Sequence, residues 1–207
     1  MAARWLGVCI LLPLVPALAQ EPDLAVGRFL VASRDLGDPN FAQTVVLLVH
    51  FDDDKGAVGL VINRRSDVPI SRVFEDMSEA KGRNDPVYVG GPVQLDSVLA
   101  LLKSSSKPDD AMRVFGNVYL IGNKQSLRKT MGSETDADSF HTYLGYAGWG
   151  AGQLEHEVEL GAWHVMAANA SEVFHADPDS VWPRLIRRTE TQIARAAKPL
   201  TCTPRCP

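Results

Sequence analysis

The stretch Leu144-Gly-Tyr-Ala-Gly-Trp-Gly-Ala-Gly-Gln-Leu-Glu155 interleaves four glycines with two aromatic residues, Tyr146 and Trp149. Glycine suits backbone that needs a positive φ, or backbone that another group approaches closely. Residues 141–147 predict a strand, and apolar residues that recur at about one helical turn from Leu154 predict a helix. We therefore interpret the stretch as a strand, a glycine turn and a helix.

A glycine turn that opens a helix also suits an anion, because a helix N-terminus presents free N–H groups and the positive end of the helix dipole. The spacing of Gly145, Gly148, Gly150 and Gly152 lacks the Gly-Lys-Ser/Thr ending of a Walker A loop. It also lacks the G-x-G-x-x-G pattern of a dinucleotide-binding turn. Two interpretations stay open: tight packing of backbone and rings, and binding of an anion or another small ligand.

The flanking sequence predicts a mixed fold. The clearest hairpin joins residues 44–51 to residues 57–63 across an aspartate-rich turn. Further strands are predicted at 27–33, 87–92, 118–122 and 163–168, while 97–102 fits either a short buried strand or a helix. Helices are predicted at 70–79, at 124–131 with Asn123 as N-cap, and at 178–188 with Asp177 as cap. Strands and helices mix without regular βαβ alternation, so the sequence predicts an α+β fold.

The length and charge of the chain restrict its class. A chain of 207 residues with 45% hydrophobic and 22% charged residues has ordinary globular composition. Its formal net charge is -4. Nucleic-acid binding depends largely on Lys and Arg neutralising phosphates, so we expect no nucleic-acid partner.

The first nineteen residues carry the pattern of a secretory signal peptide. Arg4 gives a positive start, residues 5–18 are apolar, and Ala17-Leu-Ala19 is a cleavage signature. The apolar run is shorter than the ~20 residues of a membrane-spanning helix. We expect cleavage after Ala19, export to the periplasm or secretion, a single domain at 20–188, and a tail at 189–207.

Two cysteines remain after that cleavage, and both lie in the tail. Cys202 and Cys206 form an even pair that can close a small disulfide loop in an oxidising compartment. Two free thiols and a metal site are the alternatives, but a metal site would need further ligands, and none lies nearby in the sequence. The pair is therefore a candidate disulfide.

Four segments together resemble the YqgE/AlgH family of bacterial proteins. They are Asp38-Pro-Asn-Phe41, Gly56-Ala-Val-Gly-Leu-Val-Ile-Asn63, Gly90-Gly-Pro-Val93 and the opening stretch. The resemblance implies a bifurcated, mainly antiparallel sheet with a small barrel-like part, surrounded by helices. Family members are often labelled transcriptional regulators, although their molecular function is not settled. The resemblance supplies no catalytic residues.

The chain departs from the family pattern in two places. Residues 94–102 lack the aromatic segment ending in Leu-His that usually follows the Gly-Gly-Pro-Val motif. The signal peptide is the larger departure, since family members are typically cytosolic. An exported protein would not reach chromosomal DNA, so the regulator label is the weakest of the functional hypotheses.

Two functional hypotheses remain ahead of it. The first is a non-catalytic binding or regulatory module for a small ligand or a protein partner, without a metal or other cofactor. Its candidate ligand-binding residues are Asn63, Gly90, Gly91, Tyr146, Trp149, Gln153 and Glu155. The second is a hydrolase that uses Glu155 with a histidine such as His164. The absence of a G-x-S-x-G elbow and of a zincin motif favours the first hypothesis.

Overall fold

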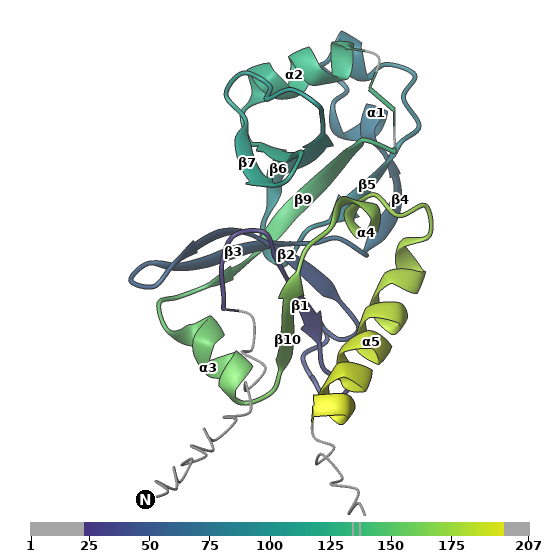
Figure 1. Ribbon diagram of the computed structural model, residues 1–207. Helices are drawn as coiled ribbons and strands as arrows, with labels where there is room; N and C mark the ends of the chain where they lie inside the picture. Colours follow the sequence, from purple (N-terminus) through teal and green to yellow (C-terminus); the bar gives the residue numbers. More distant parts are fainter. Residues whose placement is uncertain (1–22, 134, 137, 197–207) are drawn as a thin grey trace, which may run out of the picture.

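The predicted strand of the opening stretch is the branch point of the sheet. In the computed structural model, which describes residues 23–133, 135–136 and 138–196, this strand is β9 (Phe140–Trp149). One edge of β9 pairs with β6 (Val93–Lys103). Its other edge pairs first with β5 (Pro86–Val89) and further along with β3 (Gly56–Val61). Because two strands share one edge, the sheet forks at this point (Figure 1).

Ten strands of the described chain form the two arms of the fork. Beyond β3, the first arm continues through β2 (Val45–Asp52), β1 (Arg28–Ala32) and β10 (Trp163–Ala167). The second arm contains β6, β8 (Val118–Ile121) and β7 (Met112–Phe115), while β4 (Arg65–Pro69) pairs with β5. All described pairings are antiparallel except that of β5 with β9, and the sheet curls into a half-barrel. The predicted α+β, bifurcated fold is confirmed.

Helices flank both arms (Figure 1). They are α1 (Ile70–Val73), α2 (Lys124–Gly132), α3 (Gln153–Glu159), α4 (Ala170–Val173) and α5 (Val181–Ala196), with short 3-10 helices η1 (Ser78–Ala80) and η2 (Pro178–Ser180). The predicted cap of α2 is confirmed, since the Asn123 side chain accepts a hydrogen bond from the Ser126 N–H at 2.8 Å. Among the described helices, none is long and apolar enough to cross a bilayer.

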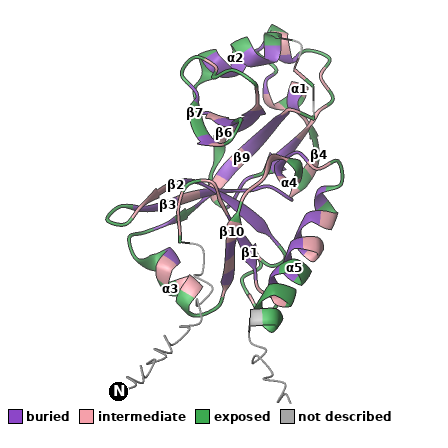
Figure 2. Cartoon of the chain, in the orientation of Figure 1, coloured by how far each residue is buried: buried purple, intermediate pink, exposed green. Residues whose placement is uncertain are grey.

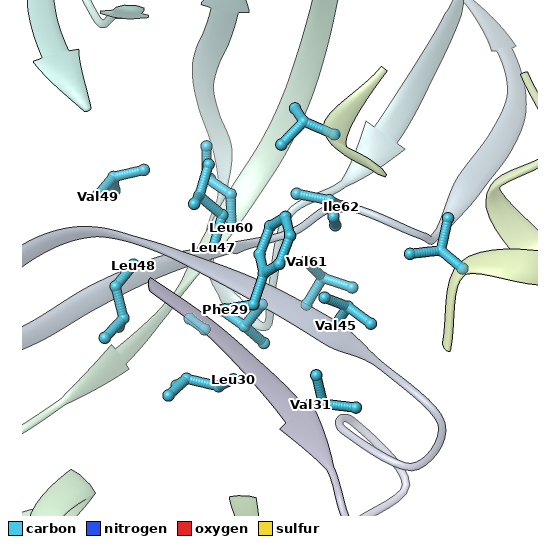
Figure 3. Packing of buried hydrophobic residues seen from close by; sticks show 14 of the residues in the cluster. Phe29, Leu30, Val31, Val45, Leu47, Leu48, Val49, Leu60, Val61 and Ile62 are labelled. Atoms are coloured by element: carbon cyan, nitrogen blue, oxygen red, sulfur yellow. The ribbon is translucent and has the colours of Figure 1, made fainter. Parts of the chain in front are cut away.

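The core lies where the first arm is covered on both faces. Residues of β1, β2 and β3 pack together and are almost wholly buried, as the close-up in Figure 3 shows. The first five residues of β2 are all buried, which suits a continuous apolar run better than an alternating one. On α5, Leu185 and Ile186 are buried while Arg187 and Arg188 are exposed. Figure 2 shows buried and exposed residues alternating along this helix. The helix therefore covers the sheet with one face.

Several local predictions differ from the structure. The helix predicted at 70–79 ends after one turn at Val73, and the chain resumes only as η1. The ambiguous segment 97–102 is part of β6, because pairing with β8 and β9 on both sides overrides any helical preference. Asp177 precedes η2 rather than α5, and its side chain makes no capping hydrogen bond.

Candidate functional site

Gly90 and Gly91 lie at the fork of the sheet. The Gly90 N–H donates to the Leu144 carbonyl at 2.8 Å, and the Gly90 carbonyl accepts from the Val61 N–H at 2.8 Å. A Cβ added to Gly91 would collide with the backbone of Tyr146. The two glycines therefore let three strands approach one another, and this approach sets β5 against β9.

Asn63 is buried at the end of the hairpin. Its Oδ1 accepts from the Val45 N–H at 2.8 Å, and its Nδ2 donates to the Gln43 carbonyl at 3.0 Å. Both ends of the amide are thus engaged with the segment that leads into β2. The structure gives Asn63 a role in closing this turn.

Trp149 and Gln153 belong to one hydrogen-bonded network centred on Glu157. Glu157 Oε2 accepts from Trp149 Nε1 at 3.0 Å and from Trp163 Nε1 at 2.8 Å. Glu157 Oε1 accepts from Gln153 Nε2 at 3.0 Å, while Gln153 Oε1 accepts from the Gly150 N–H at 3.1 Å. Sequence analysis missed Glu157 as the centre, although its spacing of four from Gln153 on a predicted helix was a usable signal.

Tyr146 and Glu155 are half-buried and lie apart from this network. Among the residues that the structure describes, the Glu155 carboxylate makes no hydrogen bond or ion pair, and none joins it to His164. His164 instead lines an open groove with Arg34 and Glu190. The structure therefore does not assemble the Glu155–His164 pair of the hydrolase hypothesis. Cys202 and Cys206 lie outside the described residues.

A separate cleft of about 120 Å³ lies where β4, β5, β9 and the end of α4 meet. We call it the seam cleft. Four aromatic residues form its buried lining: Tyr88, Phe140, His141 and Phe174. Its more accessible lining contains the polar residues Arg65, Asp85, Asp138 and His175, together with Ala176. These residues come from segments far apart in the sequence, so no local motif predicts the cleft.

An aromatic stack forms the buried side of the seam cleft. The His141 ring stacks on Tyr88 with centroids 4.5 Å apart and an interplanar angle of 23°. Phe174 packs on His141 at 5.0 Å. Burial raises the pKa of the Tyr88 phenol, and the nearby positive charge of Arg65 acts in the opposite direction. At neutral pH Tyr88 therefore presents a neutral hydroxyl.

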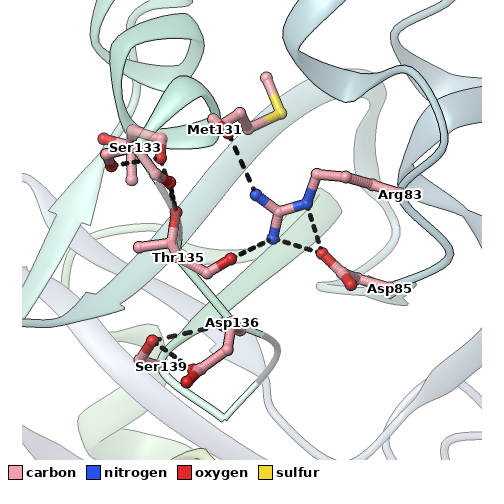
Figure 4. Close-up of polar contacts among 8 residues, drawn as sticks. Arg83, Asp85, Met131, Ser133, Thr135, Asp136 and Ser139 are labelled. Carbon is pink, nitrogen blue, oxygen red and sulfur yellow. Dashed lines mark hydrogen bonds and ion pairs between the residues drawn. The ribbon is translucent and has the colours of Figure 1, made fainter.

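Arg83 holds Asp85, one of the residues that line the seam cleft, and Figure 4 shows its contacts. Its Nε donates to Asp85 Oδ2 at 2.6 Å, and its Nη2 donates to the Thr135 carbonyl at 2.9 Å. The same guanidinium lies 5.6 Å from the centroid of the Phe140 ring. Arg83 thus ties the entry to β5 to the segment after α2, and it compensates the charge of Asp85.

His175 is oriented by Arg184. Arg184 Nη1 lies 3.3 Å from His175 Nε2, and a guanidinium can only donate. Nε2 is therefore the acceptor in that contact, while Nδ1 lies 2.9 Å from the carbonyl oxygen and 3.1 Å from the amide nitrogen of Asp177. His175 therefore stands in the cleft with both ring nitrogens facing polar groups of the protein.

The chemistry available in the seam cleft is recognition by stacking, charge and hydrogen bonding. The residues that the structure shows lining it include no Ser, Thr or Cys. Among the described residues, no group of three His, Cys, Asp or Glu side chains is placed to hold a metal ion. The lining combines an apolar wall with a few polar groups, as small-molecule sites commonly do.

Comparison with known proteins identifies the relatives of this chain. The AlgH-like family model matches residues 29–194. A UPF0301 protein of Streptomyces avermitilis is 37% identical over 186 residues, which cover 86% of this chain and 93% of that protein. A UPF0301 protein of Chlorobaculum tepidum is 33% identical, over 79% of this chain and 86% of that protein.

Solved structures agree with the sequence comparison. The AlgH protein of Pseudomonas aeruginosa is 31% identical, with a TM-score of 0.60 over 84% of this chain and 90% of that one. A Corynebacterium diphtheriae protein of 22% identity superposes with a TM-score of 0.70, over 88% of this chain and 91% of that one. At that identity the second likeness concerns the fold alone.

Proposed function

We propose that this chain, which belongs to the AlgH-like family, is a non-catalytic module of the cell envelope. In this proposal it binds a small molecule in the seam cleft. The observation that carries the proposal is the convergence of Arg65, Tyr88 and His141 on one cleft between the sheet and the segment that follows α4. Concave sites with aromatic walls and a few polar groups are the usual places where proteins hold small ligands.

The binding interpretation is supported by how the histidines are held. His141 is packed between two rings, and both nitrogens of His175 face Arg184 or Asp177. A general base needs hydrogen-bond reach to a substrate proton. Packed or engaged rings suit recognition better than proton transfer.

The residues nominated from the sequence contribute to this proposal in two ways. Gly90 and Gly91 set β5 against β9, and this places Tyr88 beside His141. Tyr146 and Glu155 are half-buried and remain candidate ligand contacts on a different surface. A Glu155→Gln variant tests that alternative, because a ligand of the seam cleft would bind it unchanged.

A thermal-shift screen tests the proposed function. The chain from Gln20 is tested with metabolites, because a ligand that binds only the folded state raises its apparent stability. Each hit is repeated with Ala176→Trp, which places an indole at the exposed rim of the cleft, and with Ala194→Trp on the exposed side of α5. We expect hits to be lost in the first variant and kept in the second. Hits that survive both substitutions would place the ligand elsewhere and contradict the proposal.

Export is a second, separable part of the proposal. It is supported by Arg4, the apolar run at 5–18 and the Ala-Leu-Ala signature that ends at Ala19. Fractionation of cells that express the full chain, followed by N-terminal sequencing, should find a chain that starts at Gln20 in the envelope fraction. An intact chain that stays in the cytosol would contradict export. It would also remove the argument against the transcriptional-regulator hypothesis.

A further inference from the structure

Most charges in and around the seam cleft already have protein partners. Asp85 is paired with Arg83, at 2.6 Å from its Nε. The two ring nitrogens of His175 face Arg184 and Asp177. The Lys103 ammonium lies 5.5 Å from the centroid of the Phe174 ring. Each of these side chains is therefore already in contact with another group of the protein.

Two lining residues of opposite charge are left over. Arg65 on β4 and Asp138 before β9 both line the cleft and are exposed. Within the described part of the chain, neither side chain makes a hydrogen bond or ion pair. Arg65 lies opposite Tyr88 in the strand register, so its charge stands beside the aromatic stack. Among its described lining residues, the cleft therefore offers one cation and one anion next to an apolar wall.

The size of the cleft limits what can use both charges. Sites for drug-sized ligands commonly measure about 300–1,000 Å³. The seam cleft measures about 120 Å³. A ligand that fills it has few heavy atoms, so its charged groups lie close together.

We propose that the seam cleft binds a small zwitterion of the amino-acid type, with its carboxylate on Arg65, its ammonium group on Asp138 and its apolar side chain against Tyr88 and Phe174. This inference rests on the proposed function and names the ligand class for the same site. Arg binds carboxylates through paired N–H donors, and an Asp carboxylate accepts strongly from an ammonium group. A ligand with one charge leaves one of the two groups without its partner.

Three probes of similar shape test the charge requirement. L-valine carries both charges, isovalerate lacks the ammonium group, and isobutylamine lacks the carboxylate. Binding to the chain from Gln20 is followed by NMR titration, with the Tyr88 and His141 ring signals as reporters. We expect L-valine to bind at least about tenfold more tightly than either analogue, since each loses one charge-assisted contact.

Two variants assign each charge to its residue. Arg65→Gln should weaken L-valine about tenfold and leave isobutylamine unchanged, whereas Asp138→Asn should weaken L-valine and leave isovalerate unchanged. Arg72→Gln and Asp53→Asn, both exposed and outside the cleft, are the matched controls and should change nothing. Unchanged thermal unfolding of the two cleft variants, which is expected at exposed positions, excludes loss of fold.

The outcomes separate this inference from the proposed function. Equal affinity for L-valine and either analogue would overturn the zwitterion class while a binding cleft stands. Absence of any shift with L-valine, alongside hits of another chemistry that Ala176→Trp removes, would also overturn the class and keep the proposed function. Hits that are insensitive to Ala176→Trp would end both.

Discussion

Trp149 and Trp163 share one hydrogen-bond acceptor: both indole N–H groups donate to Oε2 of Glu157, at 3.0 and 2.8 Å. The two rings are also in edge contact, with centroids 6.1 Å apart. One residue of α3 thereby joins the end of β9 to β10. The signature stretch is fixed by this junction as well as by its glycines.

Glu157→Ala should destabilise the fold by about 2–4 kcal/mol, because it leaves two largely buried indole donors without their acceptor. Glu159→Ala is the matched control, since that side chain is 79% exposed at the end of the same helix. It should change stability by less than about 0.5 kcal/mol. Urea unfolding of both variants measures the difference. Similar losses in the two variants would show that the shared acceptor matters little.

Gly91→Ala should destabilise the fold by about 1–3 kcal/mol or more. The added Cβ would clash with backbone atoms of Tyr146 and Ala147, which cannot move without shifting β9. Gly37→Ala adds the same methyl group where nothing lies within 4 Å, and its φ is not positive. Its effect should stay within about 0.5 kcal/mol. Thermal unfolding compares the two substitutions. If Gly91→Ala unfolds at the wild-type temperature, the fork does not depend on this glycine.

Tyr143→Phe should leave stability unchanged or raise it by up to about 1 kcal/mol. The Tyr143 hydroxyl is buried without a hydrogen-bond partner among the described residues, and burial raises its pKa well above the usual range. Removing such a group relieves a desolvation penalty. Tyr119→Phe is the contrast, since it removes the acceptor of a hydrogen bond from Arg113 Nη2 at 3.2 Å and should cost about 0.5–1.5 kcal/mol. A larger loss for Tyr143→Phe than for Tyr119→Phe would reveal a partner for the buried hydroxyl.

Acid should weaken the attachment of α2. Lys124 and Lys129 each lie 2.6 Å from a carboxylate, and they lower the pKa of Asp76 and Asp109 respectively below the usual 3.8. A carboxyl whose folded pKa is lowered stabilises the fold above its unfolded pKa, and this contribution disappears as pH falls through the folded pKa. The urea midpoint of the wild type should therefore exceed that of an Asp76→Asn/Asp109→Asn variant at pH 6. The two midpoints should converge as the pH falls through the lowered pKa values of the two carboxyls. A difference that persists at low pH would show that the pairing is not electrostatic.

The sequence by itself determined the family and the local elements. Its ordered motifs predicted the YqgE/AlgH family, and the family model and relatives confirm that membership. The 44–63 hairpin, the Asn123 cap and the helix that follows the glycine turn are confirmed as well. Each of these features depends on neighbours in the chain, whose geometry follows from residue type and spacing.

Only the tertiary structure decided how distant segments meet. The shared acceptor Glu157 could be suspected from its spacing, but its second indole comes from β10. The seam cleft combines side chains of β4, β5, β9 and the segment that follows α4, and the strands β4 and β7 were not predicted at all. Such convergence depends on which edge of β9 each strand occupies, a choice set by long-range packing. The glycine-rich stretch allows the sheet to fork at β9. The packing of distant segments around β9 decides which side chains line the seam cleft.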